Sequence, residues 1–198
     1  MAKLGRPQPL GLGHAAQEVH SIAAPMLAAA ALALAGVVAG ANPNTFVWSG
    51  PTLLVLVAAS LFLVASIQLH YHARHFYYSV QDIDFWYGLD VRRGSEVFKE
   101  LCHRQQRDFE IWERYIRRAA TCFNTGALLL GFGVSLALVP TSGDKQESWR
   151  WIALSMVLVG TVADMAWIAH LYGKRAQYAD RDAALNELNA VPDEPSEE

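Results

Sequence analysis

The sequence predicts an all-α integral membrane protein: four transmembrane helices in a bundle, with spans two and three extended into a cytoplasmic helical hairpin. Three observations lead to this prediction. Four stretches are apolar over about the 20 residues that a helix needs to cross a bilayer. Residues 95–139 have the pattern of one helix that begins amphipathic and charged and ends without any charge. Basic residues also gather on one side of the four stretches.

Composition supports this class and excludes others. The chain is 53% hydrophobic and still 18% charged, which suits a membrane domain with water-exposed extensions. Its net charge is −3, with basic and acidic residues interleaved, so we expect no nucleic-acid partner. Cys102 and Cys122 lie on the same predicted helix, about 30 Å apart along its axis, which is too far for a disulfide. They are expected to be reduced thiols.

The N-terminal part of the chain contains a tail and the first span. Residues 1–18 hold two prolines and three glycines without a hydrophobic period, which predicts a flexible cytoplasmic tail. Residues 19–41 are long enough to cross a bilayer, and Gly36 with Gly40 forms a G-x-x-x-G pair suited to close helix packing. The alternative is a cleaved signal peptide, because residues 39–41 have the small-x-small form of a cleavage site.

The remaining spans follow in order. An uncharged loop at 42–51 leads into span two, 52–69, which we expect to continue as a helix to about Tyr87. The long helix then returns to the membrane as span three and ends at Pro140, and 140–148 form a second short loop. Span four covers 149–172.

A separate amphipathic helix is expected at 176–188, followed by an acidic, disordered end. The organisation is therefore a tail at 1–18, a membrane domain at 19–173 that includes a cytoplasmic hairpin at 73–118, and a C-terminal segment at 174–198.

The basic residues predict the orientation. Nine arginines and lysines lie between spans two and three, and three more follow span four, whereas the other two connections hold only Lys145 and Arg150. The positive-inside rule therefore places both termini and the central connection in the cytoplasm. Alanine-rich spans without a eukaryotic targeting signal favour a bacterial plasma membrane.

The hairpin is predicted from two apolar stripes at helical spacing. The stripe on the first helix consists of Phe76, Val80, Ile83 and Tyr87, and the stripe on the second consists of Phe98, Leu101, Phe109 and Trp112. Three acid-first pairs four residues apart support the second helix: Glu100 with Arg104, Glu110 with Arg114, and Glu113 with Arg117. These charges indicate either a solvated face or a docking surface for a partner. A helix lying flat on the membrane is disfavoured because its charge is nearly balanced.

Histidines near the cytoplasmic ends of the spans raise the question of a metal site. His70 and His72 point to nearly opposite faces of a helix, and only His72 with His75 share a face. A metal would need two or more further ligands from other helices, so these two remain weak candidates and a membrane metalloenzyme is the least favoured class. We expect no cofactor, because no catalytic or phosphate-binding motif is present.

The clearest functional signal is a polar layer inside the predicted membrane domain. Asp164 is the acidic residue well inside a span, where carboxylates are costly and usually face the bundle interior. Asn124, Gln68 and Ser66 fall at similar depths on spans three and two, and we expect a hydrogen bond between Asp164 and Asn124. Small residues expected on helix-packing faces are Gly36, Gly40, Ala127, Gly131, Ser135 and Gly160.

Two function classes follow from these features. The first is a non-enzymatic scaffold or interaction subunit that acts through its cytoplasmic hairpin, with the lipid bilayer and either further copies of itself or another membrane or cytoplasmic protein as partners. The alternative is a small oligomeric ion channel or transport subunit in which the layer around Asp164 lines a pore.

Overall fold

The described residues form four long α-helices and no strand. The computed structural model describes residues 18–42, 45–78, 82, 85, 96–141 and 146–188, with only the backbone at 175, 176 and 178–188. A π-helical turn, η1 (Val19–Ala23), leads into α2 (Ala24–Gly40). The long helices that follow are α3 (Ser49–Ala73), α5 (Glu96–Leu138) and α6 (Glu147–Leu188). A short 3₁₀ turn, η2 (Arg74–Phe76), ends α3.

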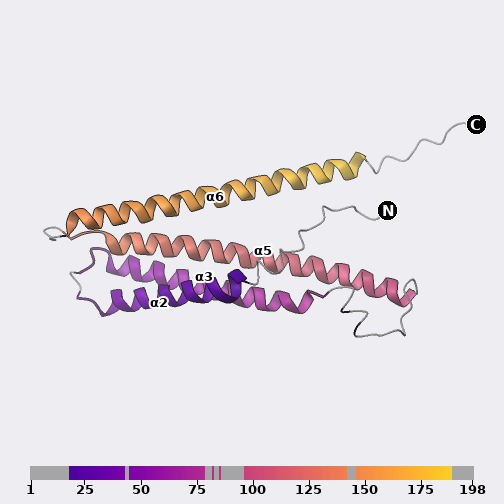
Figure 1. Ribbon diagram of the computed structural model, residues 1–198, viewed down its shortest axis with the longest axis horizontal. Coiled ribbons are helices and arrows are strands. Elements are labelled where there is room, and N and C mark those ends of the chain that lie inside the picture. Colours follow the sequence, from indigo (N-terminus) through magenta and orange to yellow (C-terminus); the bar gives the residue numbers. More distant parts are fainter. Residues whose placement is uncertain are drawn as a thin grey trace, which may run out of the picture.

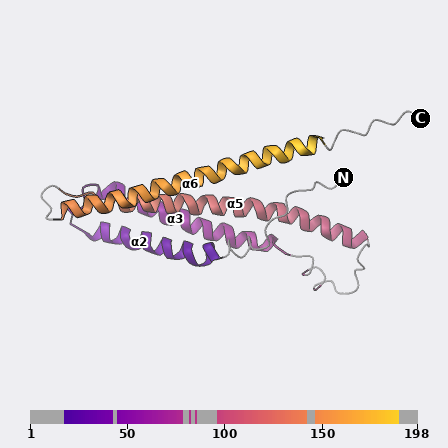
Figure 2. The ribbon, with the colours of Figure 1, turned by 45° about the horizontal axis from the view of Figure 1, so that its top comes forward.

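The four helices run alternately up and down, and α3 lies between α2 and α5 (Figure 1). The C-terminal ends of α2 and α5 and the N-terminal ends of α3 and α6 lie together at one end of the bundle, which we call the loop end. α6 packs on α5 near the loop end and diverges from it toward its own C-terminus, as both views show (Figure 2). Both α5 and α6 extend beyond α2 at the end opposite the loop end.

The tightest seam of the bundle joins α3 to α5. Leu63 and Leu56 of α3 are fully buried, and they lie against Gly126 and Gly133 of α5. The two leucines are seven residues apart, as are the two glycines, so the contact repeats after two helical turns in an antiparallel register. The absence of a side chain on each glycine lets the helices approach closely.

The other face of α3 packs on α2 through small side chains. Every third or fourth residue of α2 is buried, with exposed fractions of 6% or less; these residues are Ala24, Ala28, Ala31, Ala35 and Val38. The helix begins with a π-helical turn because Pro25 is the second residue of α2. A proline ring clashes with the carbonyl four residues earlier, so the Ala24 amide instead bonds the Val19 carbonyl five residues back.

The end of α3 differs from the prediction that span two continues to about Tyr87. The α-helix ends at Ala73, and Tyr77 has extended backbone angles after the 3₁₀ turn. The reason lies in α5, where Gln105 donates a hydrogen bond to the Tyr78 carbonyl oxygen at 2.9 Å. The Tyr78 hydroxyl also donates to the Asp108 carboxylate at 2.7 Å. These bonds hold the chain out of a helix just after η2.

The C-terminal half of the chain also differs from the sequence-based prediction in one respect. A break was expected between 149–172 and 176–188, but α6 is one helix of 42 residues. The only unfavourable residue at the expected break is Gly173, and one glycine inside a helix costs only about 1 kcal/mol. The long helix at 95–139 is confirmed as α5, which ends at Leu138, two residues before Pro140.

All four long helices are long and apolar enough to cross a membrane, on the stretches Val19–Gly40, Ser49–Phe76, Glu96–Leu138 and Glu147–Lys174. Several predictions fall outside the described residues: the tail at 1–17, the apolar positions Val80, Ile83 and Tyr87, and the acidic end at 189–198.

The α3–α5 seam predicts that adding one methyl group to Gly126 destabilises the bundle. A Cβ there would lie 2.7 Å from Leu63 Cγ and 3.1 Å from the Ala59 carbonyl oxygen, so the helices would have to separate. We expect Gly126→Ala to lower the free energy of unfolding by about 1–3 kcal/mol, measured by reversible denaturation in mixed micelles.

The matched control is Gly36→Ala on α2, where a Cβ would meet no atom within 4 Å. This variant should be neutral or stabilising, because alanine is the better helix former. Equal effects of the two substitutions would contradict the close seam.

Candidate functional site

Two histidines pack against each other between the start of the first helix and the end of α3. The ring centroids of His20, in η1, and His70, in α3, are 4.8 Å apart with an angle of 25° between the ring planes. Phe123 of α5 lies edge-on to His20 at 5.9 Å. Only 4% of His20 and 8% of His70 are exposed, so three helical elements enclose the pair.

The pair is polar but lacks hydrogen-bond partners. His20 Nδ1 and both ring nitrogens of His70 are buried without a partner in the described part of the chain. A neutral imidazole has one donor and one acceptor nitrogen, and each one left unpaired costs free energy. The nitrogen lone pairs lie in the ring planes, so stacked rings do not direct them toward a common point. The arrangement therefore does not form a two-ligand metal clamp.

The sequence analysis did not single out His20, although a signal was present. Reading the buried stripe of α2 backward from Ala24 by four residues leads to position 20, so His20 continues the face that α3 covers. His70 was considered only together with its neighbours in sequence.

His72 and His75 lie outside this pair. Their rings are 6.1 Å apart, and both side chains are exposed. His72 packs edge-on against Tyr115 at 4.8 Å, and His75 against Tyr71 at 5.6 Å. Among the described residues, no group of three or more histidine, cysteine, aspartate or glutamate side chains could hold a metal ion.

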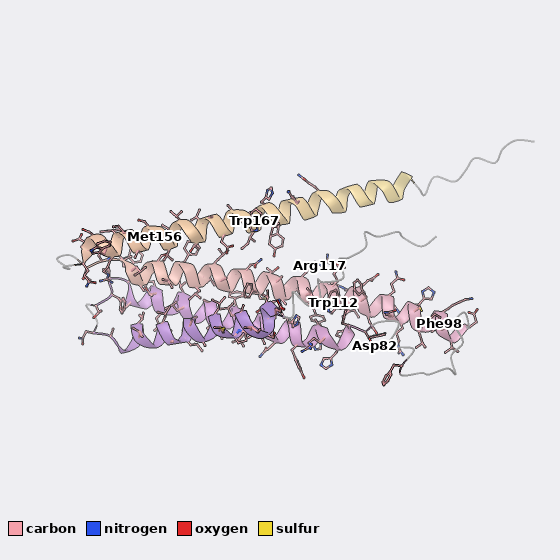
Figure 3. The ribbon with its side chains drawn as sticks, viewed as in Figure 1. Asp82, Phe98, Trp112, Arg117, Met156 and Trp167 are labelled. Carbon is pink, nitrogen blue, oxygen red and sulfur yellow. The ribbon has the colours of Figure 1, made fainter. Side chains whose placement is uncertain are left out.

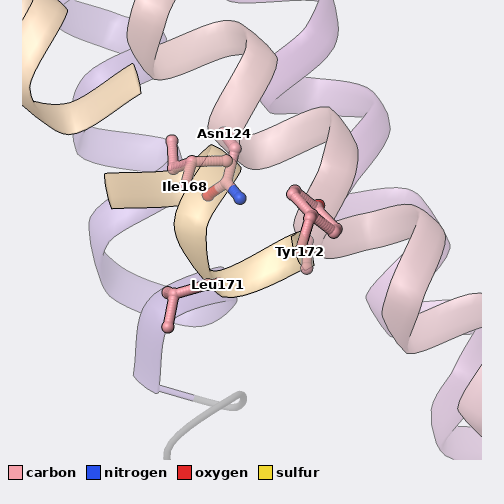
Figure 4. Close-up of a pocket in the computed structure, with 5 residues that line it drawn as sticks. Asn124, Ile168, Leu171 and Tyr172 are labelled. Carbon is pink, nitrogen blue, oxygen red and sulfur yellow. The ribbon is translucent and has the colours of Figure 1, made fainter. Parts of the chain in front are cut away.

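The predicted polar layer is not assembled within the chain. Asp164 and Gln68 are exposed, whereas Ser66 is buried and donates its hydroxyl to the Leu63 carbonyl oxygen at 2.7 Å. Asn124 lines a small cavity of about 70 Å³ between α5 and α6, with Ala120, Ile168, Leu171 and Tyr172 around it (Figure 4). The expected hydrogen bond between Asp164 and Asn124 is not formed, so that prediction was wrong.

The rotation of α6 about its axis explains why Asp164 does not reach Asn124. At this level of α6, Thr161 and not Asp164 faces α5: it is buried, it lies against Gly131, and its hydroxyl donates to the Val157 carbonyl oxygen at 2.8 Å. Three residues later the helix has turned by about 300°. Asp164 therefore lies beside the contact and not in it. A pore lined by the four polar residues would need several copies of the chain and stays a prediction.

The residues expected on helix-packing faces divide into two groups. Gly131 and Ser135 do lie in contacts of α5, and Ala127 is half-buried. By contrast, a Cβ on Gly36, Gly40 or Gly160 would meet no atom within 4 Å. The sequence analysis missed Gly126 and Gly133, whose seven-residue spacing was the available signal.

The charged half of α5, residues 96–118, is held to the segment that follows α3. Trp112 is only 5% exposed, and its ring lies 5.0 Å from that of Tyr77 (Figure 3). It is therefore not free to bind a partner, contrary to the interaction face predicted from Phe98, Leu101, Phe109 and Trp112. Phe98 and Leu101 are half-buried, and Phe109 remains 36% exposed.

The exposed surface of this half consists mainly of charged side chains. Of the three predicted ion pairs, Glu113 with Arg117 is present at 3.8 Å. Glu100 instead pairs with Arg107 at 3.5 Å, one turn beyond the expected Arg104. Arg114 donates to the backbone oxygen of Glu110 at 3.3 Å. Such exposed contacts contribute little to stability, so these charges remain available for other partners.

Comparison with known proteins adds no assignment, because no family model, curated protein or solved structure matches the chain. The fold itself defines the class: in the part of the chain that the structure describes, the regular elements are all helices, and four of them are each long and apolar enough to span a membrane.

The unpartnered imidazoles predict that an apolar ring at position 20 stabilises the protein. His20→Phe keeps a ring against His70 and Phe123 while it removes a buried nitrogen without a partner. We expect the free energy of unfolding in detergent to rise by about 1 kcal/mol.

His72→Phe is the control, because His72 is exposed and its change should stay within about 0.5 kcal/mol. A marked loss of stability in His20→Phe would mean that the buried nitrogens have a bound partner, such as water or an ion.

Proposed function

We propose that this chain is a multi-pass membrane protein that works as an interaction subunit and binds another protein through the charged half of α5. Four spans hold it in a bacterial plasma membrane, with both termini and the charged half in the cytoplasm. The positive-inside rule supports this orientation, because the loop end carries only Lys145 and Arg150 as basic residues.

One observation supports the proposal above the others: α5 is too long for a span alone. Its 43 residues extend to about 65 Å, roughly twice the thickness of a bilayer core. The apolar half accounts for one crossing, and the charged half continues without a break. A surface that rises rigidly from the membrane is suited to holding a partner, because little order is lost when the partner binds.

The chemistry of this surface favours a protein over a lipid. Residues 96–118 contain five acidic and six basic side chains, so the surface carries almost no net charge with which to attract anionic lipid. Alternating charges can instead form ion pairs with a complementary protein surface, which sets specificity and the association rate. The side of the charged half that carries Gln105 and Asp108 is already covered, because both residues hydrogen-bond to Tyr78.

The proposed orientation can be tested with the two native cysteines. Cys102 lies in the charged half and Cys122 about 30 Å farther along the helix, inside the span. In Cys122→Ser, a membrane-impermeant maleimide should label Cys102 in inside-out vesicles but not in sealed right-side-out vesicles.

In Cys102→Ser, the remaining Cys122 should react only after detergent is added. Fast labelling of Cys122 in sealed vesicles, or labelling of Cys102 from the outer side, would contradict the proposed placement.

The interaction role predicts a contact that depends on charge. A photo-crosslinking amino acid at position 110, which is exposed on the charged half, should give one discrete adduct in cells. Arg114→Glu, one turn away, should lower the adduct yield about tenfold, because a single reversed ion pair is worth about 1–2 kcal/mol.

The crosslinker at position 149, exposed at the loop end, is the control and should give no such adduct. An adduct at 110 that persists in Arg114→Glu and in high salt would argue against an electrostatic docking surface.

A further inference from the structure

The helix α6 leaves most of its surface uncovered by the rest of the chain. Among the described elements, α5 is the only one on which α6 packs extensively. Most residues of α6 between Glu147 and Lys174 are exposed. Exposed apolar residues such as Met156 and Trp167 are ordinary on a helix that faces lipid (Figure 3). Asp164 is the exception, because its carboxyl group is also exposed.

Asp164 lies near the middle of the proposed span. It is ten residues before Lys174 and fourteen after Arg150, or about 15 and 21 Å along the axis, so neither the nearest lysine nor the nearest arginine of α6 reaches it. It forms no hydrogen bond or ion pair with the described part of the chain. A lone carboxyl group facing lipid at this depth is costly, so polar residues there almost always face a protein interior or another polar group.

A second feature lies one turn away on the same flank of α6. Gly160 lines a shallow depression together with Ser155, Met156 and Val159. A Cβ on Gly160 would meet no atom within 4 Å, whereas Gly126, Gly131 and Gly133 each receive a side chain from a neighbouring helix. Gly160 is thus open to close approach by a helix from outside the chain.

We propose that a second copy of this chain covers this flank, so that two α6 helices pack together at Gly160 and their Asp164 carboxyl groups hydrogen-bond to each other. A protonated carboxyl group both donates and accepts, so it is complementary to itself across a two-fold axis. Symmetry also places both Asp164 residues at the same depth. No lysine or arginine lies between Arg150 and Lys174, and the one histidine there, His170, is six residues after Asp164, or about 9 Å farther along the axis, so the facing helix offers no opposite charge at that level.

This inference rests on the proposed membrane placement, and it identifies one partner within the membrane that is separate from the cytoplasmic partner of α5. The glycine permits the close backbone approach typical of packed membrane helices, and the carboxyl pair supplies a polar contact that lipid cannot. Each Asp164 leaves the lipid-facing surface when the dimer forms.

Cysteine crosslinking of the full chain in lipid vesicles tests the interface. In a background with Cys102→Ser and Cys122→Ser, Gly160→Cys should form a disulfide-linked dimer on mild oxidation. Val162→Cys is the matched control: it is at almost the same depth, its native side chain is 45% exposed, and it points about 200° away around the helix. Equal crosslinking at both positions, or none at 160, overturns the proposal.

The carboxyl pair is tested by energy transfer between labelled copies diluted in vesicles. Asp164→Leu should weaken dimerisation at least tenfold, although it removes a polar group from the monomer surface and should not impair folding. Asp164→Asn should retain most of the affinity, because an amide also donates and accepts. Unchanged dimerisation in Asp164→Leu overturns the proposal.

The two proposals fail in different ways. A monomer in which Cys102 and Cys122 still label as expected would overturn the dimer and leave the membrane placement intact. A chain that does not partition into membranes would overturn both.

Discussion

The α3–α5 seam is the constraint on which the rest of the bundle depends. Two buried leucines of α3 lie against two glycines of α5, with the same seven-residue spacing on each helix. Lipid is as apolar as leucine, so helices in a membrane gain little from hydrophobic burial and associate through close packing instead. A register fixed at Leu63 and Leu56 continues along both helices, and it brings Trp112 against Tyr77 beyond the end of α3.

The same seam determines how much of α5 is available to α6. One side of α5 is occupied by α3, and α6 contacts the remaining side at a few points, including Thr161 against Gly131 and the Tyr172 hydroxyl 3.2 Å from that of Thr121. Because α6 turns Thr161 toward α5, Asp164 lies beside this contact and is exposed. A polar residue left exposed on a long apolar helix is the observation from which we propose an association with a second chain.

Buried polarity is distributed unequally between the two ends of the bundle. Near the loop end, the hydroxyl groups of Thr52 and Ser135 donate to the backbone oxygens of Trp48 and Gly131, each four residues earlier, at 2.7 and 2.9 Å. Near the other end, His20 and His70 contact each other without such bonds. A hydroxyl group can reach a carbonyl one turn earlier, but an imidazole ring is too long and rigid to do so, and therefore depends on a neighbour that the described helices do not supply.

The sequence by itself determined the number of long helices, their order and the single long helix at 95–139, because apolar length and charge patterning are local properties. It could not determine which face of each helix is buried, since alanine, glycine and leucine occur on all sides of these spans. Only the tertiary structure showed that Gly126 and Gly133 receive leucines while Gly36 and Gly40 receive nothing, that His20 meets His70, and that Thr161 takes the place expected for Asp164. Each of these depends on helix rotation, which is decided by contacts between residues far apart in the chain.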